Sequence, residues 1–223
     1  MISIILIEPQ FEGNVGAIAR SMKNFGFSRL ILVNPKCEIG QEMRNRAKHA
    51  NDVIDKIKIL KNMPKMDFLI GTTSKTGNDY NIPRNPITPK ELSEIIPTSG
   101  KIGIVFGRES DGLTNKEISK CDFVVKIPVS ETYPSMNLSH AVTLILYELS
   151  QFNKINQNKI TPISLNEKKQ LMKMIKESLT HLEFKNEDKK KTQILVWKKI
   201  IGKSFLSKRE AYALMGFFKK LIS

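Results

Sequence analysis

Short apolar runs recur along the first part of the chain and are separated by longer segments of mixed polarity. Each run is rich in β-branched or aromatic residues and is almost continuously apolar, which is typical of parallel strands buried on both faces. The runs predict five strands, over Ser3–Ile7, Leu30–Val33, Phe68–Ile70, Ile102–Phe106 and Phe123–Ile127.

The segments between these runs carry apolar residues at helical spacing. One such series extends from Val15 to Phe25, and a cleaner one extends from Leu138 to Leu149. Thr114 precedes Glu117 by three residues, which is the capping-box pattern that opens a helix. The alternation predicts an α/β fold, with a mostly parallel sheet and helices on both of its faces.

A polar stretch rich in Asn, Gln and Lys follows and ends at Thr161-Pro162. Beyond it the sequence shows three amphipathic helical patterns and no strand. Their apolar positions are Leu171, Met172, Ile175, Leu179 and Leu182, then Ile194, Trp197 and Ile201, then Ala211, Leu214, Met215 and Phe218. We therefore divide the chain into an α/β domain over 1–154, a linker over 155–163 and a basic three-helix extension over 164–223.

The positive charge of the chain is unevenly distributed. The formal net charge is +14, and residues 155–223 hold 16 lysines and arginines against 6 acidic residues. Such a basic segment favours a polyanion as partner, because lysine and arginine displace counterions from phosphates. The alternative is that the lysines only reflect a lysine-rich proteome and lie on solvated faces without binding a partner.

Several classes of protein do not fit this sequence. No apolar run reaches the ~18 residues of a membrane-spanning helix. The apolar segment Met1–Ile7 lacks a basic lead, so we interpret it as a strand and not as a secretory signal. Cys37 and Cys121 lie far apart and indicate neither a disulfide framework nor a zinc site. A reducing cytoplasm is the expected location.

The candidate chemistry lies where the predicted strands end, because ligands of open α/β sheets bind beyond the carboxyl ends of the strands. Glycines, hydroxyls and amides are concentrated at 8–16, 71–74, 107–113 and 133–139. The GxGxxG fingerprint, the P-loop lysine and the HExxH zinc motif are all absent from the sequence. The three histidines, His49, His140 and His181, are scattered. The pattern favours a group transfer that needs no metal.

Three motifs occupy these segments in order. The first consists of Asn14, Gly16, Arg20, Phe25 and Gly26. The second consists of Phe106, Gly107, Glu109, Gly112 and Leu113. The third consists of Ser135, Asn137, Leu138, Ala141, Val142, Tyr147 and Glu148. In these motifs the sequence closely resembles the SpoU family of SPOUT methyltransferases, and within it the TrmJ-type tRNA 2'-O-methyltransferases. The resemblance covers Ile2 to about Leu149, whereas the tail matches only in having helices after a linker.

The resemblance implies a trefoil-knotted domain that holds a bent S-adenosylmethionine, and a homodimer that places RNA where the two subunits meet. The implied reaction is methylation of a ribose 2'-hydroxyl in tRNA, at nucleotide 32 of the anticodon loop. The implied cofactor contacts are Thr72, Thr73, Ser74, Gly107, Ile127, Pro134, Ser135 and Met136. The implied catalytic positions are Arg20 and Ser135, with Asn14, Glu109 and Asn137 beside them. Ser139-His140 departs from the family pattern, in which small or apolar residues are commoner.

Each singled-out residue also has a plainer interpretation. Arg20 is either the family's favoured base, a clamp on a substrate phosphate, or a solvated helix arginine; a guanidinium keeps its proton in proteins, which argues against the base. Glu109 could simply bind backbone N–H groups and shape its loop. Asn137 could be only the cap of the following helix. Trp197 could stack on a base or belong to a core, and the run Lys189–Lys191 could be a solvated turn.

The function also has alternatives. Methylation of rRNA or of another tRNA position would use the same motifs. An RNA-binding protein without catalysis is a second alternative, against which the intact Arg20, Ser135 and Asn137 argue. A Rossmann-like nucleotide enzyme is a third, and the missing glycine-rich fingerprint argues against it.

Overall fold

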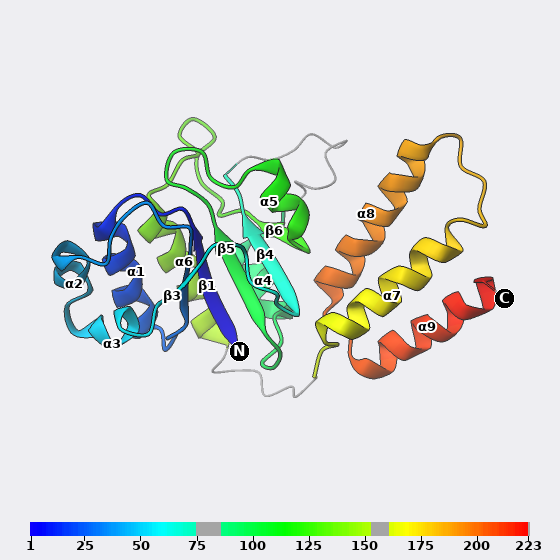
Figure 1. Cartoon of the computed structure of the whole chain (residues 1–223), viewed down its shortest axis with the longest axis horizontal. Coiled ribbons are helices and arrows are strands. Elements are labelled where there is room, and N and C mark those ends of the chain that lie inside the picture. Colours follow the sequence, from blue (N-terminus) through cyan, green and yellow to red (C-terminus); the bar gives the residue numbers. More distant parts are fainter. Residues whose placement is uncertain (75–85, 153–160, 223) are drawn as a thin grey trace.

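A computed structural model of the chain describes residues 1–74, 86–152 and 161–222. Its centre is a six-stranded sheet in which all pairs are parallel and the strand order is β3-β2-β1-β5-β4-β6 (Figure 1). The strands are β1 (Ile2–Ile7), β2 (Leu30–Val33), β3 (Lys58–Leu60), β4 (Phe68–Thr72), β5 (Ile102–Phe106) and β6 (Phe123–Val125). The predicted α/β fold with a parallel sheet is confirmed.

The predicted strands all appear, with differences at their ends. Strand β6 ends at Val125 and not at Ile127, because the N–H of Lys126 donates to the carbonyl of Ile87, outside the sheet ladder. The edge strand β3 was not predicted, since its short segment is largely exposed and carries no long apolar run. Burial of β-branched residues on both faces holds the central strands β1 and β5 together.

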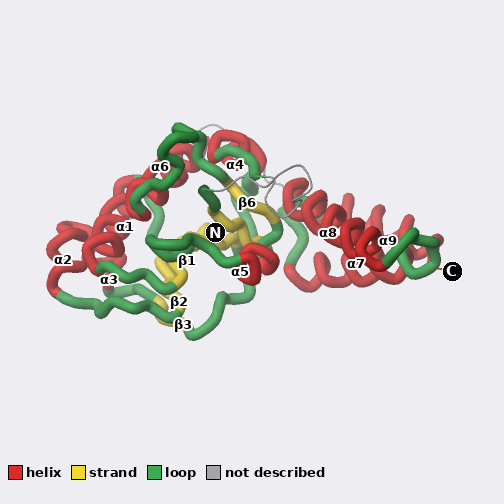
Figure 2. The backbone as a smooth tube through the Cα atoms, turned by 90° about the horizontal axis from the view of Figure 1, so that it is seen from above, coloured by secondary structure: helices red, strands yellow, loops and turns green. Residues whose placement is uncertain are grey.

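The helices are α1 (Glu12–Asn24), α2 (Gln41–Ala47), α3 (Asn51–Ile54), α4 (Pro89–Ile95), α5 (Asn115–Lys120), α6 (Leu138–Phe152), α7 (Leu165–Ser178), α8 (Glu187–Ser204) and α9 (Lys208–Ile222), with a 3-10 turn η1 (Lys48–Ala50). They cover the two faces of the sheet unequally: α1, α4 and α6 lie on one side, and α5 lies on the other (Figure 2). Ile4 and Leu6 face the larger core, whereas Ile5 and Ile7 face the smaller core with Leu113 and Ile118.

The strand order places the binding region. From β1 the chain moves outward through β2 to β3, and it then returns to the other side of β1 to form β4, β5 and β6. The order therefore reverses between β1 and β5, and ligands of open α/β sheets bind at the carboxyl edge near such a point. The segments after β1, β4, β5 and β6, in which the sequence motifs lie, meet at this edge. The trefoil knot implied by the resemblance stays a prediction.

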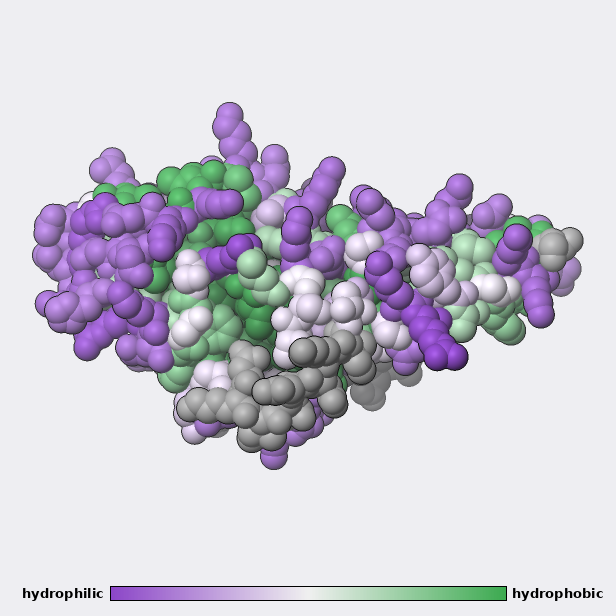
Figure 3. Space-filling view, turned by 90° about the horizontal axis from the view of Figure 1, so that it is seen from below, coloured by the Kyte–Doolittle hydropathy of each residue, from purple (hydrophilic) through white to green (hydrophobic). Residues whose placement is uncertain are grey.

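The helices of the extension dock on the β6 edge of the sheet, to the right in Figure 1. Ile163, Leu171, Ile175 and Ile201 are almost fully buried in the larger core. The ring of Phe205 lies 4.7 Å from that of Phe68, centroid to centroid. Hydrophilic side chains project from these helices (Figure 3). The extension therefore shares a core with the sheet.

The end of the first helix of the extension and the predicted linker can be compared with the structure. The first predicted helix ends at Ser178, so Leu182 lies beyond it and is exposed. The predicted linker falls on residues 155–160, outside the described residues, and on 161–163; within the latter, Ile163 is buried and its N–H donates to the carbonyl of Leu206. Among the described residues, no helix is long and apolar enough to cross a membrane.

Candidate functional site

An inner cavity of about 330 Å³ opens at the carboxyl ends of β4, β5 and β6. Its walls come from the ends of these strands, from the loop 107–113, from the loop 129–136 and from the first turns of α6. All eight predicted cofactor contacts line it, namely Thr72, Thr73, Ser74, Gly107, Ile127, Pro134, Ser135 and Met136. Residues separated by more than sixty positions in sequence are thus brought into one hollow.

The backbone of the inner cavity is tightly packed at Gly107. A Cβ atom on Gly107 would lie 2.0 Å from the carbonyl carbon of Gly112 and 2.3 Å from the backbone nitrogen of Leu113. Only glycine lets the loop fold back on itself here. Gly112 has φ +68°, a left-handed conformation that completes the turn. The wall opposite this loop is apolar, with Ile127, Leu138 and Ile145 among its residues.

An outer cavity of about 730 Å³ adjoins the inner one, beside the start of α1. The two cavities share Glu109, Ser135, Met136 and Leu138 as lining residues. The remaining lining residues of the outer cavity are Phe11, Gly13, Asn14, Ala17, Glu42, Arg46, Tyr133, Asn137, Ser139 and His140. Four of the five predicted catalytic residues therefore surround the outer cavity.

A chain of hydrogen bonds joins three of these residues. Asn137 Nδ2 donates to Asn14 Oδ1 at 3.2 Å, and Asn14 Nδ2 donates to Glu109 Oε1 at 3.0 Å. The other oxygen of Glu109 accepts from the N–H of Gln10 at 3.1 Å. Asn137 Oδ1 accepts from the N–H of Ser139 at 2.9 Å, as expected for the cap of α6. The chain ties the loops after β1, β5 and β6 to one another.

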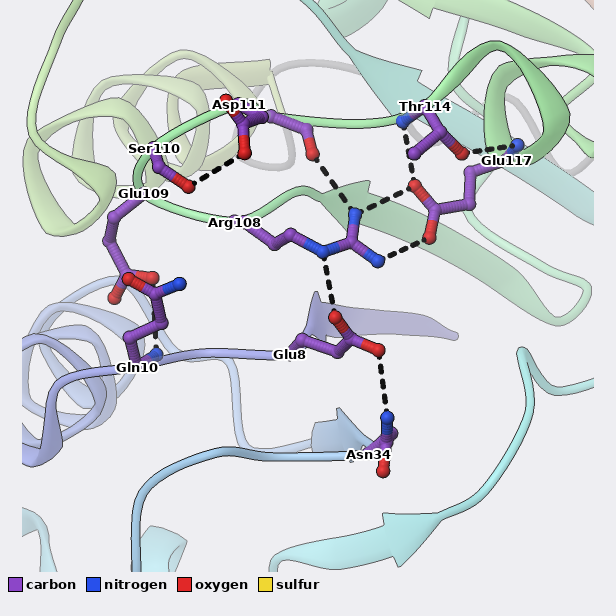
Figure 4. A network of polar contacts seen from close by, with 10 residues as sticks. Glu8, Gln10, Asn34, Arg108, Glu109, Ser110, Asp111, Thr114 and Glu117 are labelled. Atoms are coloured by element: carbon purple, nitrogen blue, oxygen red, sulfur yellow. Dashed lines mark hydrogen bonds and ion pairs between the residues drawn. The ribbon is translucent and has the colours of Figure 1, made fainter.

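A second network, which the sequence motifs did not reveal, is centred on Arg108 (Figure 4). Arg108 Nε donates to Glu8 Oε2 at 2.7 Å, and its two terminal nitrogens donate to both oxygens of Glu117 at 3.0 and 3.1 Å. Asn34 Nδ2 donates to the other oxygen of Glu8 at 2.7 Å. Gly112 and Arg108 also exchange two backbone hydrogen bonds. Arg108 thereby fastens the loop 107–113 to the ends of β1 and β2.

The charges of this network stabilise one another. The hydrogen bond from Arg108, with a second from Asn34, lowers the pKa of Glu8 below its usual value. Burial opposes ionisation of Glu117, but the hydrogen bonds from Arg108 and Thr114 outweigh it and lower the pKa of this carboxyl too. Glu117 is also part of the predicted capping box of α5, which is confirmed. The only local signal for Arg108 was its place between two residues of the second motif.

Arg20 lies apart from both cavities. It is exposed on α1 and lines a separate hollow with Lys23, Lys48 and His49. Gly13 and Ala17 of the same helix line the outer cavity, so Arg20 continues their stripe one turn further along α1. Within one chain, the structure does not bring Arg20 to Ser135.

Trp197 and Ser139, which the sequence also singled out, make contacts within the protein. The ring of Trp197 packs edge-on against Phe218 at 5.2 Å, in agreement with the core interpretation. The side chain of Ser139 donates to Asn137 Oδ1 at 2.7 Å, which explains a hydroxyl at this departure from the family pattern. Cys37 and Cys121 are both free. Within the described ranges, no group of three or more His, Cys, Asp or Glu side chains could hold a metal ion.

Comparisons with known proteins agree with this geometry. Residues 1–147 match the SpoU rRNA Methylase family. The tRNA (cytidine-2'-O-)-methyltransferase TrmJ of Methanocaldococcus jannaschii is 44% identical, over 98% of this chain and 99% of its own. A crystal structure of TrmJ from Z. mobilis covers all of both chains with a TM-score of 0.70 at 24% identity. AviRb of Streptomyces viridochromogenes, in complex with AdoMet, covers 69% of this chain and 61% of its own, with a TM-score of 0.54 at 19% identity.

Proposed function

This chain belongs to the SpoU methylase family, and from that premise we propose that it transfers the methyl group of S-adenosylmethionine to a ribose 2'-hydroxyl of tRNA. The tRNA substrate rests on the relative from Methanocaldococcus jannaschii, which matches along its whole length. The expected target is nucleotide 32 of the anticodon loop, on the motif resemblance. The cytoplasm is the expected location.

The observation that carries the proposal is the pair of adjoining cavities with Ser135 between them. A methyl transfer between two bound molecules needs a site for the donor and a site for the acceptor that meet at one point. Holding the two reactants in line can by itself lower the barrier by about 7–11 kcal/mol. The inner cavity suits the donor, and the outer cavity suits a nucleotide.

The inner cavity fits S-adenosylmethionine in size and chemistry. Its volume of about 330 Å³ falls within the ~300–1,000 Å³ typical of small-molecule sites. The tight turn at Gly107 places the loop 107–113 at the wall of the cavity, and Ile127, Leu138 and Ile145 offer an apolar surface for an adenine ring. The AdoMet in the AviRb structure supports the same choice. When bound, this cofactor supplies an electrophilic methyl group.

The outer cavity has the features of a site for an unstacked nucleotide. Phe11 and Tyr133 line it and are 58% and 77% exposed, so both aromatic side chains are accessible to a base that could stack on them. Arg46 supplies a fixed positive charge for a phosphate. Ser135 would then bind the ribose at the boundary between the cavities, while the chain Asn137–Asn14–Glu109 holds the surrounding loops in place.

Arg20 enters this scheme through a second copy of the chain. Leu144 and Tyr147 on α6 are 41% and 46% exposed and lie beside α1, because the ring of Tyr147 contacts Phe25 at 6.1 Å. An apolar strip of this kind supports a homodimer built through α1 and α6. Such a dimer would bring Arg20 to the partner's outer cavity, where it would clamp a substrate phosphate and stabilise the developing alkoxide. Light scattering at micromolar concentration tests the dimer, and a fully active monomer would remove it.

The test of the function is radiolabelled methyl transfer to bulk tRNA and to bulk rRNA, followed by the variant Arg20→Ala. Wild type should label tRNA, and labelling of rRNA alone would overturn the proposed substrate. Arg20→Ala should cut the rate at saturating tRNA by about 10²–10³-fold, the scale for loss of one preorganised donor. Arg209→Ala, at an exposed position of α9, is the control and should keep the wild-type rate.

Arg20→Lys separates two roles for this side chain. Lysine keeps the charge but loses the planar fork that binds a phosphate through two nitrogens. Recovery of the rate by lysine would indicate charge neutralisation, whereas no recovery would indicate bidentate positioning. A wild-type rate in Arg20→Ala would mean that Arg20 is a surface arginine.

A further inference from the structure

A third cavity, of about 280 Å³, lies where the extension meets the sheet and is lined from α5, α7 and α8. Its lining residues are Met66, Leu69, Lys120, Asp122, Leu165, Lys168, Lys169, Met172, Lys176, Ile194, Lys198 and Ile201. We call it the junction cavity. Five lysines and one aspartate surround it, and neither the motifs nor the proposed reaction assigns it a role.

The aspartate of the junction cavity is already engaged. Both oxygens of Asp122 accept from Lys168 Nζ at 2.9 Å, and one of them also accepts from the N–H of Leu69 at 2.8 Å. Lys168 and Asp122 are 8% and 6% exposed, so this neutralised pair forms the floor of the cavity. The charges of the remaining four lysines are not balanced by any carboxylate among the lining residues that the structure describes.

Lys198 is half-buried at the wall of this cavity. Its Nζ donates to the carbonyls of Ser119 and Cys121 at 2.6 and 2.7 Å, which holds it against the wall of the cavity. Burial is the main cause that lowers the pKa of Lys198; the charge of Asp122 opposes it, and the charges of Lys168 and Lys176 add smaller lowering effects. An anion in the cavity would stabilise the charged form of this lysine.

The arrangement of the exposed lysines indicates the kind of anion. Lys120, Lys169 and Lys176 are exposed at the rim, on two different helices. Lys169 and Lys176 are seven residues apart on α7, which separates them by roughly 10 Å along the helix axis. One small anion cannot contact both, whereas a chain of phosphates can. Met66, Met172 and Ile194 offer apolar surface for the sugars between the phosphates.

We propose that the junction cavity binds the phosphate backbone of the RNA substrate, as a contact separate from the two cavities at the motif loops. This inference rests on the proposed function, because it takes RNA as the substrate. It replaces a diffuse attraction by the whole basic extension with a defined site, whose geometry is fixed by the docking of α7 and α8 on the sheet.

The test compares two triple substitutions in the full-length chain. Lys120, Lys169 and Lys176 are changed together to glutamine in the first variant. In the control variant the same change is made at Lys189, Lys190 and Lys191, which lie in the first turns of α8 and do not line the junction cavity. Both variants lose three positive charges, at different places; the control also loses the exposed ion pair between Lys191 and Asp188.

Binding of unmodified tRNA is measured between 50 and 200 mM salt. Each phosphate contact contributes about 0.7–0.9 to the slope of log affinity against log salt, so loss of three contacts lowers the slope by about 2–3. Over this fourfold range of salt, the wild type should therefore lose roughly 20- to 40-fold more of its affinity than the first variant does. The control variant should change the slope by less than about 1.

Two results would overturn the inference. Equal slopes for the two triple variants would mean that RNA responds to the total charge of the extension, and an unchanged slope in the first variant would mean that these lysines do not contact RNA. Methyl transfer by the wild type to the same tRNA preparation is measured in parallel, so that failure of the proposed function can be distinguished from failure of the junction site. An active wild type with either of these results removes the junction site alone, and an inactive wild type removes the function itself.

Discussion

Replacing Lys168 by methionine tests how firmly the extension is fastened to the sheet. Lys168 lies in the second turn of α7, and its Nζ donates to Asp122 and to the carbonyl of Asp67 while lying 4.3 Å from the centre of the Phe68 ring. Methionine keeps most of the apolar volume but removes the charge. Asp122 would then be left as a buried carboxylate that accepts a hydrogen bond from the N–H of Leu69 but has lost its cationic partner.

The magnitude follows from the burial of the pair. Breaking a buried ion pair by removing one partner costs about 3–5 kcal/mol, because the other charge is left uncompensated. In a chain of this length each kcal/mol lowers the melting temperature by roughly 2–4 °C. Lys168→Met should therefore melt about 6–20 °C below wild type. Lys173→Met, the same change at an exposed position of α7, should stay within about 0.5 kcal/mol.

A double variant separates loss of the pair from loss of shape. Asn in place of Asp122 keeps an oxygen that can accept from the N–H of Leu69 but carries no charge. Lys168→Met with Asp122→Asn should recover most of the stability, since removing both charges of a buried pair is often close to neutral. The assays are thermal unfolding, which gives the melting temperature, and urea unfolding, which gives the free energy; both are followed by circular dichroism and by the fluorescence of Trp197, which lies in α8.

The shared core also predicts the form of the unfolding curve. Ile175, Ile201 and Phe205 pack in the same core as the sheet, so the two signals should follow one transition. The reasoning would be refuted if Lys168→Met lost less than about 1 kcal/mol, or if the Trp197 signal changed well before the circular dichroism of the whole chain. Either result would mean that the buried pair does not fasten the extension.

Two further predictions concern the loop 107–113. Gly107→Ala should weaken binding of S-adenosylmethionine by more than about tenfold in calorimetry with EDTA present, because the added Cβ collides with the backbone of Gly112 and displaces the loop; Gly216→Ala, where a Cβ meets nothing within 4 Å, is the control and should bind normally. Arg108→Gln should lower the free energy of unfolding at neutral pH more than in acid. The pKa values of Glu8 and Glu117 are lowered in the folded protein, so their stabilisation is present above the ordinary value of 4.5 and is lost as the pH falls through the folded value. Urea unfolding should therefore show a gap between wild type and variant at pH ~7 that shrinks below pH ~4, and a gap that widens in acid would contradict the assignment.

The fold class and the placement of the expected cofactor contacts at one edge of the sheet could be predicted from the sequence, whereas contacts between distant charged side chains could not. The eight expected cofactor contacts meet in one cavity because parallel strands deliver their carboxyl ends to the same edge of the sheet. The order of strands and the alternation with helices were enough to place them there. A glycine such as Gly107 also indicated, by its lack of a side chain, a place where two backbone segments pack closely.

The contacts that the sequence did not reveal join distant residues. Arg108 and Glu8 are 100 positions apart, and a charged side chain in a loop gives no local sign of which carboxylate it will meet. The same holds for Lys168 and Asp122: the apolar stripe of α7 predicted a helix, but not that a lysine on it would be buried against the sheet. Short elements such as α2, α3 and β3 are too brief to show a period.

Asn137 shows that a structural and a functional interpretation of one residue need not compete. Its Oδ1 accepts from the N–H and the hydroxyl of Ser139 and so caps α6, which leaves its Nδ2 to donate. That donor meets Asn14 Oδ1, and the orientation of the Asn14 amide is set in turn, with its Nδ2 directed at Glu109. Glu109 is therefore held as an acceptor, with one oxygen bound by Asn14 and the other by the N–H of Gln10. A carboxylate whose two oxygens are both engaged by donors is better suited to positioning the loops than to taking a proton from the ribose. The cap of α6 thus determines, through two amides, the role that is left for Glu109.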